Sequence, residues 1–118
     1  MRILIVDDNE RVRRLIKLLV SDVCDEVIER GDGESALRAY AEHVPDWVLM
    51  DIELGKMDGL KSSLGIKDAY PEARILIVTS YDDNRLRQRA KEVGACGYVL
   101  KENLSVLREI LTSAAYCW

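Results

Sequence analysis

The stretch Ile3-Leu4-Ile5-Val6-Asp7-Asp8 decides the fold, because it is a short apolar run that ends abruptly in two carboxylates. Such runs are typical of strands that are buried on both faces of a parallel sheet. Later runs end in the same way: residues 47–50 before Asp51, 75–78 before Thr79 and 98–100 before Lys101. Since the carboxyl ends of parallel strands share one edge of the sheet, we expect these polar residues to meet in one crevice.

Helical patterns alternate with these strands, and a short polar strand around residues 26–29 adds a fifth. The alternation predicts a doubly wound α/β fold, in which helices cover both faces of a five-stranded parallel sheet. The fourth helix is expected over roughly residues 83–93 and the fifth from about residue 103. At helical spacing, the apolar positions expected to face the core are, helix by helix, Val12, Leu15, Ile16 and Leu19; Leu37, Tyr40, Ala41 and Val44; Leu60 and Leu64; Leu86, Ala90 and Val93; and Leu104, Leu107, Leu111 and Ala114.

The composition indicates one globular domain spanning residues 1–118, with no output domain in this chain. A net charge of -4 argues against a nucleic-acid-binding surface, because duplex binding needs a concentrated basic face. No apolar run approaches the ~18 residues of a membrane span. The chain passes from Met1 straight into a strand, with no signal peptide before it. We therefore expect a cytoplasmic protein that makes no contact with membranes.

The cysteines Cys24, Cys96 and Cys117 show no metal-binding spacing, so we expect reduced thiols. The single histidine, His43, has no Cys or His neighbour in the sequence and is expected at a helix end or on the surface.

The expected crevice would hold the carboxylates of Asp7, Asp8 and Asp51, and like charges that close raise one another's pKa. A hard divalent cation removes this repulsion, since Mg²⁺ takes one or two carboxylates and completes its shell with water and phosphate. One carboxylate then remains as a nucleophile that can accept a phosphoryl group. The Thr79 hydroxyl can donate to a phosphoryl oxygen, and the Lys101 ammonium can neutralise another. Together the strand ends predict a site for a divalent cation and a phosphoryl group.

Over its whole length the chain resembles the receiver domain of two-component response regulators. The resemblance rests on ILIVDDNE at 3–10, VLMDIELGKMDGL at 48–60, ILIVTS at 75–80 and GACGYVLKENL at 94–104. It implies a flavodoxin-like (α/β)5 fold with the strand order 2-1-3-4-5, which puts the acidic residues beside the switch point of the sheet. It also implies a signalling domain rather than an enzyme. Such a domain takes a phosphoryl group from the phosphohistidine of a histidine kinase and assists only its own phosphorylation and dephosphorylation.

The resemblance assigns roles to the acidic residues. Asp51 matches the phosphoacceptor and also lies among the ligands of Mg²⁺ or Mn²⁺. Asp8 matches the direct metal ligand, and Asp7 is expected to hold metal-bound water. The backbone carbonyl of Glu53 matches the third protein ligand.

The resemblance also implies a switch. Thr79 matches the switch hydroxyl, Lys101 the phosphate-binding lysine, and Tyr98 an aromatic ring that turns inward when Thr79 moves toward the phosphoryl group. The surface expected to change is the fourth helix, fifth strand and fifth helix. Glu53 and Tyr81 occupy positions expected to tune the lifetime of the aspartyl-phosphate.

Some residues depart from the pattern of the family. Gly55 and Lys56 stand where Pro and Gly are usual, so this loop is expected to be more flexible and to bring an extra cation near the site. Glu102 replaces the usual Pro, as is common in receivers attached to LuxR-type helix-turn-helix output domains, and residues 97–101 resemble those receivers too. These features favour a piece of a longer regulator, whereas the ending at 114–118, without linker character, favours a stand-alone receiver.

The expected partners are a sensor histidine kinase or a phosphotransfer protein. A homodimer or a downstream protein target is also open, because Val106 and Ile110 form a second apolar stripe unless they belong to the core.

Two alternatives compete with a phosphorylated receiver. A pseudo-receiver would keep the fold as a phosphorylation-independent protein-binding module, but such modules usually lose an acidic-pair residue, the acceptor or the lysine. A dinucleotide-binding enzyme would use Gly31 and Gly33, because residues 31–36 fit GxGxxA between a strand and a helix, with Asp51 downstream. That motif leaves Thr79 and Lys101 unexplained.

Overall fold

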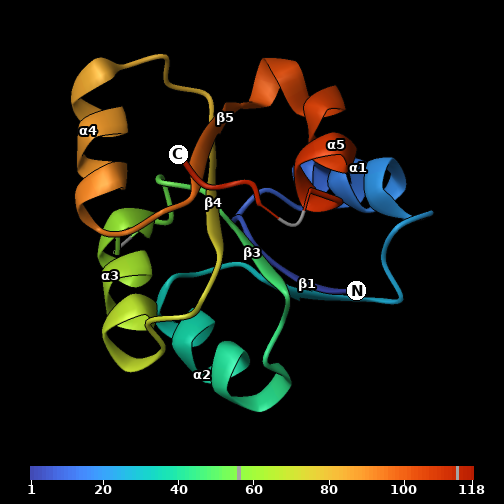
Figure 1. Ribbon diagram of the computed structural model, residues 1–118, viewed down its shortest axis with the longest axis horizontal. Helices are drawn as coiled ribbons and strands as arrows, with labels where there is room; N and C mark the ends of the chain where they lie inside the picture. The colour runs from blue at the N-terminus through green and yellow to red at the C-terminus, as the bar shows by residue number, and fades with distance from the viewer. Residues whose placement is uncertain (56, 114) are drawn as a thin grey trace.

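In the computed structural model, which describes residues 1–55, 57–113 and 115–118, a parallel sheet is sandwiched between two layers of helices (Figure 1). The five strands lie in the order β2-β1-β3-β4-β5 and all pairs are parallel, which confirms the predicted flavodoxin-like topology. Along the chain the elements are β1 (Arg2–Val6), α1 (Glu10–Val20), β2 (Glu26–Arg30), α2 (Glu34–His43), β3 (Trp47–Met50), α3 (Gly59–Ala69), β4 (Ile75–Thr79), α4 (Asn84–Glu92), β5 (Gly97–Leu100), the 3₁₀ helix η1 (Lys101–Val106) and α5 (Leu107–Leu111).

The sheet separates two apolar clusters, because successive side chains of a strand point to opposite faces. In β1, Leu4 and Val6 pack toward α2, α3 and α4, whereas Ile3 and Ile5 pack toward α1 and α5. The central strands β1, β3 and β4 are almost fully buried. They read as continuous apolar runs for that reason.

Side-chain caps fix where several helices begin. The carboxamide of Asn9 accepts hydrogen bonds from the backbone N–H groups of Arg11 and Val12 and so starts α1. Asp58 caps α3 and Asp83 caps α4 in the same manner. The caps of α1 and α3 follow directly on the loops that leave β1 and β3, so helix starts and the carboxyl ends of strands lie together.

The buried faces of two helices differ from the prediction. In α2 the core contacts are made by Ala36, Ala39 and Tyr40, whereas the predicted Leu37 and Val44 are 39% and 62% exposed, and Ala41 is exposed as well. Near its start α2 packs closely against α3, where the Ser62 hydroxyl donates to the Gly33 carbonyl at 2.8 Å, and the small Ala36 lies on this buried face.

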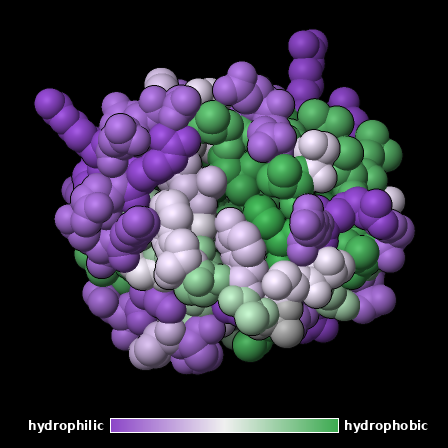
Figure 2. Space-filling view, turned by 45° about the horizontal axis from the view of Figure 1, so that its top comes forward, coloured by the Kyte–Doolittle hydropathy of each residue, from purple (hydrophilic) through white to green (hydrophobic). Residues whose placement is uncertain are grey.

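In α1 and α3 the apolar pattern predicted a wider buried stripe than forms. Leu15 is 47% exposed and Leu64 is 44% exposed, while Val20 and Ile66 are buried instead. Leu18 is 70% exposed, so apolar surface remains on α1. Figure 2 shows hydrophilic side chains over α4 and apolar ones toward the side of η1, α5 and α1.

The expected fifth helix is two pieces. The 3₁₀ helix η1 carries the chain away from β5, and α5 is a single short helical segment. Leu104, Leu107 and Leu111 are buried as predicted. Ile110 is buried too, and the partly buried Val106 packs against the same cluster, which assigns the second apolar stripe to the core. The predicted contact of Ala114 and the extra cation at Lys56 lie outside the described residues.

Among the described residues, no helix combines the length and hydropathy that crossing a bilayer requires. The three cysteines are free thiols.

Candidate functional site

The carboxyl edge of the sheet gathers the polar residues that follow the apolar runs. Asp7 comes directly after β1 and Asp51 after β3, Thr79 ends β4, and Lys101 follows β5. Carboxylate oxygens of Asp7, Asp8 and Asp51 lie within 4.8 Å of one another. The strand order brings these residues together although they are up to 94 positions apart in the sequence.

Burial and charge divide the site into an inner and an outer part. Asp7 and Asp51 are 2% and 4% exposed, whereas Asp8 is exposed. The Lys101 ammonium bridges the two buried carboxylates, with its Nζ 2.9 Å from Asp7 Oδ2 and 3.2 Å from Asp51 Oδ2. Among the described residues, Lys101 is the one cation that pairs with the side chains of this three-carboxylate cluster, which leaves an excess of negative charge there.

This imbalance appears in the pKa values. Burial and then the neighbouring charge of Asp7 raise the pKa of Asp51 to about 6, although Lys101 acts in the opposite direction. Burial would lower the pKa of Lys101, but the hydrogen bond to Asp7 and the charge of Asp51 raise it. The Lys101 ammonium is thus held charged, while the negative charge of Asp51 is neutralised only in part. A divalent cation beside Asp8 would neutralise the remaining negative charge.

Local backbone contacts orient Asp7. Its Oδ1 accepts a hydrogen bond from the Asn9 backbone N–H at 2.9 Å, and its backbone oxygen accepts from Arg13 Nη1 at 2.6 Å. Arg13 is itself paired with Glu29 on β2 at 3.0 Å. The sequence analysis did not assign Arg13 this role, and its position one helical turn after Asn9 is the only signal that would have suggested it.

Asp51 is held between β1 and the start of α3. The Asp51 N–H donates to the Val6 carbonyl at 2.9 Å, and the Gly59 N–H donates to the Ile52 carbonyl at 2.8 Å. A Cβ on Gly59 would lie 1.7 Å from the Asp51 carbonyl oxygen, so only glycine fits at this close approach. Sequence reasoning missed Gly59, whose signal was its place directly after the Asp58 cap.

The β4 side of the crevice leads outward through a chain of contacts. Thr79 is fully buried, and its hydroxyl accepts from the Tyr81 N–H at 3.2 Å. The Tyr98 O–H donates to the Tyr81 carbonyl at 2.5 Å, and the Tyr81 O–H donates to the Glu53 carboxylate. The predicted switch and tuning residues are therefore linked to one another, and the link reaches β5.

The GxGxxA motif follows β2, the edge strand of the sheet. Gly33 is buried at the start of α2, and a Cβ at this position would lie 3.2 Å from Ser62 Cβ and 3.3 Å from Met57 Sδ. A hollow of about 200 Å³ nearby is lined by Asp32, Gly33, Glu34, Leu54 and Met57. Helix packing accounts for Gly33 without a phosphate ligand.

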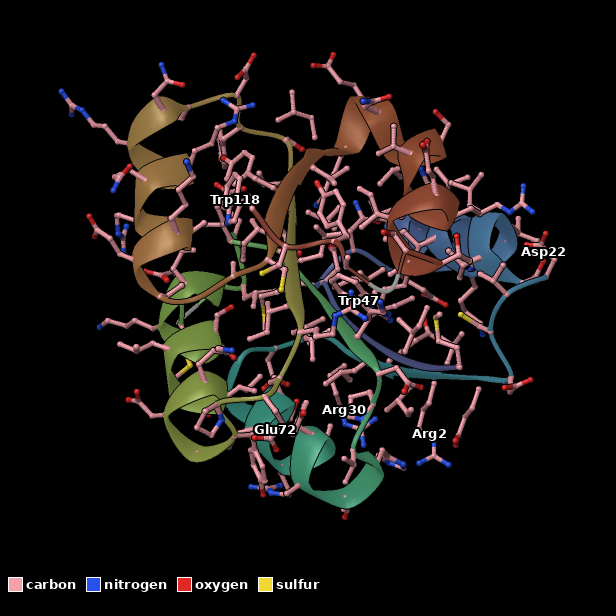
Figure 3. All side chains as sticks on the ribbon, in the orientation of Figure 1. Arg2, Asp22, Arg30, Trp47, Glu72 and Trp118 are labelled. Atoms are coloured by element: carbon pink, nitrogen blue, oxygen red, sulfur yellow. The ribbon has the colours of Figure 1, made fainter. Side chains whose placement is uncertain are left out.

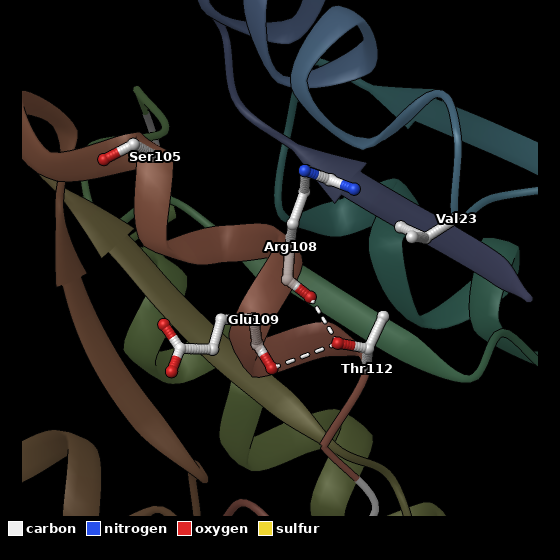
Figure 4. Close-up of a pocket in the computed structure, with 5 residues that line it drawn as sticks. All are labelled: Val23, Ser105, Arg108, Glu109 and Thr112. Carbon is white, nitrogen blue, oxygen red and sulfur yellow. Dashed lines mark hydrogen bonds between the residues drawn. The ribbon is translucent and has the colours of Figure 1, made fainter.

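A second hollow, of about 300 Å³, lies between α5 and the turn after α1 (Figure 4). Two of its polar side chains are engaged within the chain: the Thr112 hydroxyl donates to the Arg108 and Glu109 carbonyls, and the Arg108 guanidinium pairs with Asp22. It contains none of the residues at the carboxyl edge of the sheet.

The fold and the site define a doubly wound α/β domain with an acidic, lysine-bridged crevice at the carboxyl edge of its sheet. The family model of the response regulator receiver domain matches residues 3–112. The chain therefore belongs to the response regulator receiver domain family.

Curated relatives agree with this assignment. The chain is 33% identical to the transcriptional regulatory protein DegU of Brevibacillus brevis over 103 residues, which cover 86% of this chain and 44% of DegU. It is 37% identical to the chemotaxis protein CheY of Bacillus subtilis over 101 residues, which cover 85% of this chain and 84% of CheY. The chain thus spans about half the length of regulators such as DegU and most of the length of CheY.

Solved structures show the same fold. A LuxR-family two-component response regulator from Aurantimonas sp. matches with a TM-score of 0.86 and 33% identity, covering 93% of this chain and 81% of that chain. The BeF3-activated receiver domain of Klebsiella pneumoniae RstA matches with a TM-score of 0.84 and 28% identity, covering 96% of this chain and all of that domain. The predicted likeness to LuxR-type receivers is confirmed.

Proposed function

We propose that this domain is a phosphorylation switch in which Asp51 accepts the phosphoryl group. The observation that carries the proposal is the Lys101 ammonium held 3.2 Å from a buried Asp51 carboxylate at the carboxyl edge of the sheet. A buried carboxylate beside a fixed cation can act as a nucleophile toward phosphorus, because the cation stabilises the charge that builds up on the phosphoryl oxygens.

The acidic cluster fits Mg²⁺ or Mn²⁺. Asp8, Asp51 and the backbone carbonyl of Glu53 would hold the ion, with Asp7 positioned to accept from its bound water. When bound, the ion supplies a second positive charge against the phosphoryl oxygens. The donor set is all oxygen, as these hard cations prefer, and three clustered carboxylates exceed what Lys101 neutralises.

In the proposed reaction an Asp51 carboxylate oxygen forms a bond to phosphorus as the bond from phosphorus to the donor's histidine nitrogen breaks. The nitrogen keeps the electron pair of that bond, so no oxidant or further reactant is needed. Lys101 neutralises one phosphoryl oxygen, and the Thr79 hydroxyl turns to donate to another. The domain assists only this transfer and the later hydrolysis, and we propose no other enzymatic activity.

The contacts of Thr79 give this event a route outward. If the Thr79 hydroxyl moves toward the phosphoryl group, the Tyr81 N–H loses its hydrogen-bond acceptor. The carbonyl of the same Tyr81 accepts the hydrogen bond of the Tyr98 O–H, so a shift of Tyr81 reaches Tyr98. Movement of this loop would therefore change how Tyr98 packs between β5 and α4. We propose that the α4-β5-α5 surface is the one that switches.

The proposed donor is a sensor histidine kinase or a phosphotransfer protein in the cytoplasm, as for the family. We further propose that residues 1–118 form one receiver domain. Its output is either a downstream protein that docks on the switching surface or a DNA-binding domain in a longer regulator, an alternative supported by the match to only 44% of the transcriptional regulatory protein DegU.

Intact mass after treatment with acetyl phosphate and Mg²⁺ tests the proposal. We expect wild type to gain one phosphoryl group, Asp51→Asn to gain none, and EDTA to abolish the gain. Thr79→Ala is the matched control for loss of a site hydroxyl, and it should still be phosphorylated. Unmodified wild type that nevertheless binds Mg²⁺ would instead identify a pseudo-receiver.

A further inference from the structure

The last residues of the chain fold back onto the start of β5. The Trp118 backbone N–H donates to the Cys96 carbonyl at 2.9 Å, and its indole Nε1–H donates to the Ala95 carbonyl at 2.8 Å. Figure 3 shows Trp118 beside β5 and α4, where the Lys91 ammonium lies 4.9 Å from the centre of its ring. This C-terminal tail, residues 115–118, thus has defined contacts with the edge of the sheet.

Further contacts hold the tail in place. Arg74 Nη2 donates to the Ser113 and Tyr116 carbonyls at 3.1 and 3.3 Å. A Cβ on Gly97 would lie 2.8 Å from a carbon of the Tyr116 ring, so glycine at the first position of β5 gives the tail its room. The tail therefore sits in a fitted position.

This path brings two cysteines together. The Sγ atoms of Cys96 and Cys117 lie 2.7 Å apart, although the residues are 21 positions apart in the chain. Cys96 is buried and Cys117 is exposed. A disulfide needs the sulfurs at about 2.05 Å, so a small side-chain adjustment is enough to join them. The third cysteine, Cys24, follows α1 and precedes β2, the edge strand at the far side of the sheet from β5.

We propose that Cys96 and Cys117 are a redox modification site, at which a reversible intramolecular disulfide ties the C-terminal tail to the edge of the sheet beside α4. The site takes a small disulfide oxidant of the glutathione type. The proposal does not depend on the phosphorylation of Asp51.

The difference in exposure sets the order of the steps. The Cys117 thiolate attacks one sulfur of oxidised glutathione and releases one reduced glutathione, which leaves a mixed disulfide on Cys117. The Cys96 sulfur then attacks Cys117 Sγ, its proton passes to the departing second glutathione, and the protein disulfide forms. Two protein thiols are oxidised and one glutathione disulfide is reduced to two thiols. Burial, and then the neighbouring Cys117, raise the pKa of Cys96 to about 11, so the exposed Cys117 is the thiol that meets the oxidant first.

The experiment compares wild type with Cys24→Ser, Cys96→Ser and Cys117→Ser, each reduced and then incubated with oxidised glutathione. The proteins are unfolded in N-ethylmaleimide and their intact masses are measured. We expect wild type to lose two hydrogens and to take up one maleimide, on Cys24, and Cys24→Ser to form the same bridge and take up none. Dithiothreitol should restore every thiol in both proteins.

Cys117→Ser is the informative variant, because Cys117 is exposed and its loss leaves the core intact. It should lose the bridge and keep wild-type thermal stability under reducing conditions. Cys96→Ser should stop at a glutathione adduct on Cys117. The proposal is overturned if wild type keeps three reactive thiols, stops at a glutathione adduct, or joins only to a second copy.

Discussion

At the scale of single residues, the site is governed by an imbalance of charge that geometry makes unavoidable. Lys101 lies within ion-pair distance of both Asp7 and Asp51, and Asp8 adds a third carboxylate nearby. Because Asp7 and Asp51 are buried, water screens their repulsion poorly. This repulsion lowers the stability of the folded protein, and we expect a bound cation to relieve it.

The loss of stability caused by the charge of Asp51 should be visible when wild type is compared with Asp51→Asn. In EDTA at pH 7 we expect this variant to be more stable than wild type by about 1–3 kcal/mol, because the pKa of Asp51 is raised from 3.8 to about 6 and its charged form is disfavoured by folding. A raised carboxyl pKa costs stability above pH 6 and nothing below pH 3.8, so the difference should shrink as the pH falls. Urea denaturation at several pH values measures it.

Added Mg²⁺ provides the matched comparison for Asp51→Asn. The ion should raise the melting temperature of wild type more than that of the variant. A variant less stable than wild type in EDTA would contradict this view of the site.

Glu53 and Tyr81 link the loops on either side of the crevice, through the hydrogen bond from the Tyr81 O–H to the Glu53 carboxylate. Removing this link should open the crevice to water and speed the loss of the phosphoryl group. For Glu53→Ala and Tyr81→Ala we expect decay about fivefold faster, which corresponds to ~1 kcal/mol in the barrier. Tyr81→Phe keeps the ring and isolates the hydrogen bond. Decay of the phosphoprotein is followed by intact mass, and unchanged rates in both alanine variants would refute the role.

At the scale of elements, α3 is positioned by a backbone contact that permits no side chain. Gly59→Ala would force a Cβ against the Asp51 carbonyl, and we expect it to destabilise the protein by ~2 kcal/mol or more. Gly65→Ala, in the same helix with open space at its Cβ position, is the control, and it should be neutral or stabilising by up to ~1 kcal/mol. Chemical denaturation of both variants compares them, and equal effects would show that the close approach is not limiting.

Helix α4 depends on its cap more than on its packing, since Ala90 is its only buried residue. We therefore expect its amides to exchange with solvent faster than those of β4. Asp83→Ala removes the acceptor for the Arg85 and Leu86 N–H groups and should raise the exchange of α4 further, by about fivefold for a loss of ~1 kcal/mol. Amides of α4 that are protected from hydrogen exchange as strongly as those of the sheet would contradict this dependence on the cap.

The elements also show what sequence reasoning can reach. The strands were predictable because full burial on both faces produces continuous apolar runs, as in β1 and β4. The face of α2 was predictable only at Tyr40, because the rest of its core side is made of Ala36 and Ala39 while Leu37 and Val44 are exposed. The 3₁₀ start of the last helix was also missed, since η1 has the same apolar spacing as an α-helix over so short a stretch.

At the scale of the whole molecule, the strand order turns scattered residues into a site. Asp7, Asp51, Thr79 and Lys101 were predictable because each one follows or ends a buried strand, and the parallel arrangement fixes the edge at which they meet. The supports from Arg13 and Gly59 were not, because they act through backbone contacts that only the assembled fold shows. The pairing of Cys96 with Cys117 likewise depends on the path of the tail.

The central claim, that Asp51 carries the phosphoryl group, is tested most directly by chemical trapping. The protein is treated with acetyl phosphate and Mg²⁺ and then reduced with borohydride, which converts an aspartyl-phosphate to homoserine, and its peptides are sequenced by mass spectrometry. We predict homoserine at position 51 alone, and none when EDTA is present. Homoserine at Asp7 or Asp8, or at no position, would contradict the account.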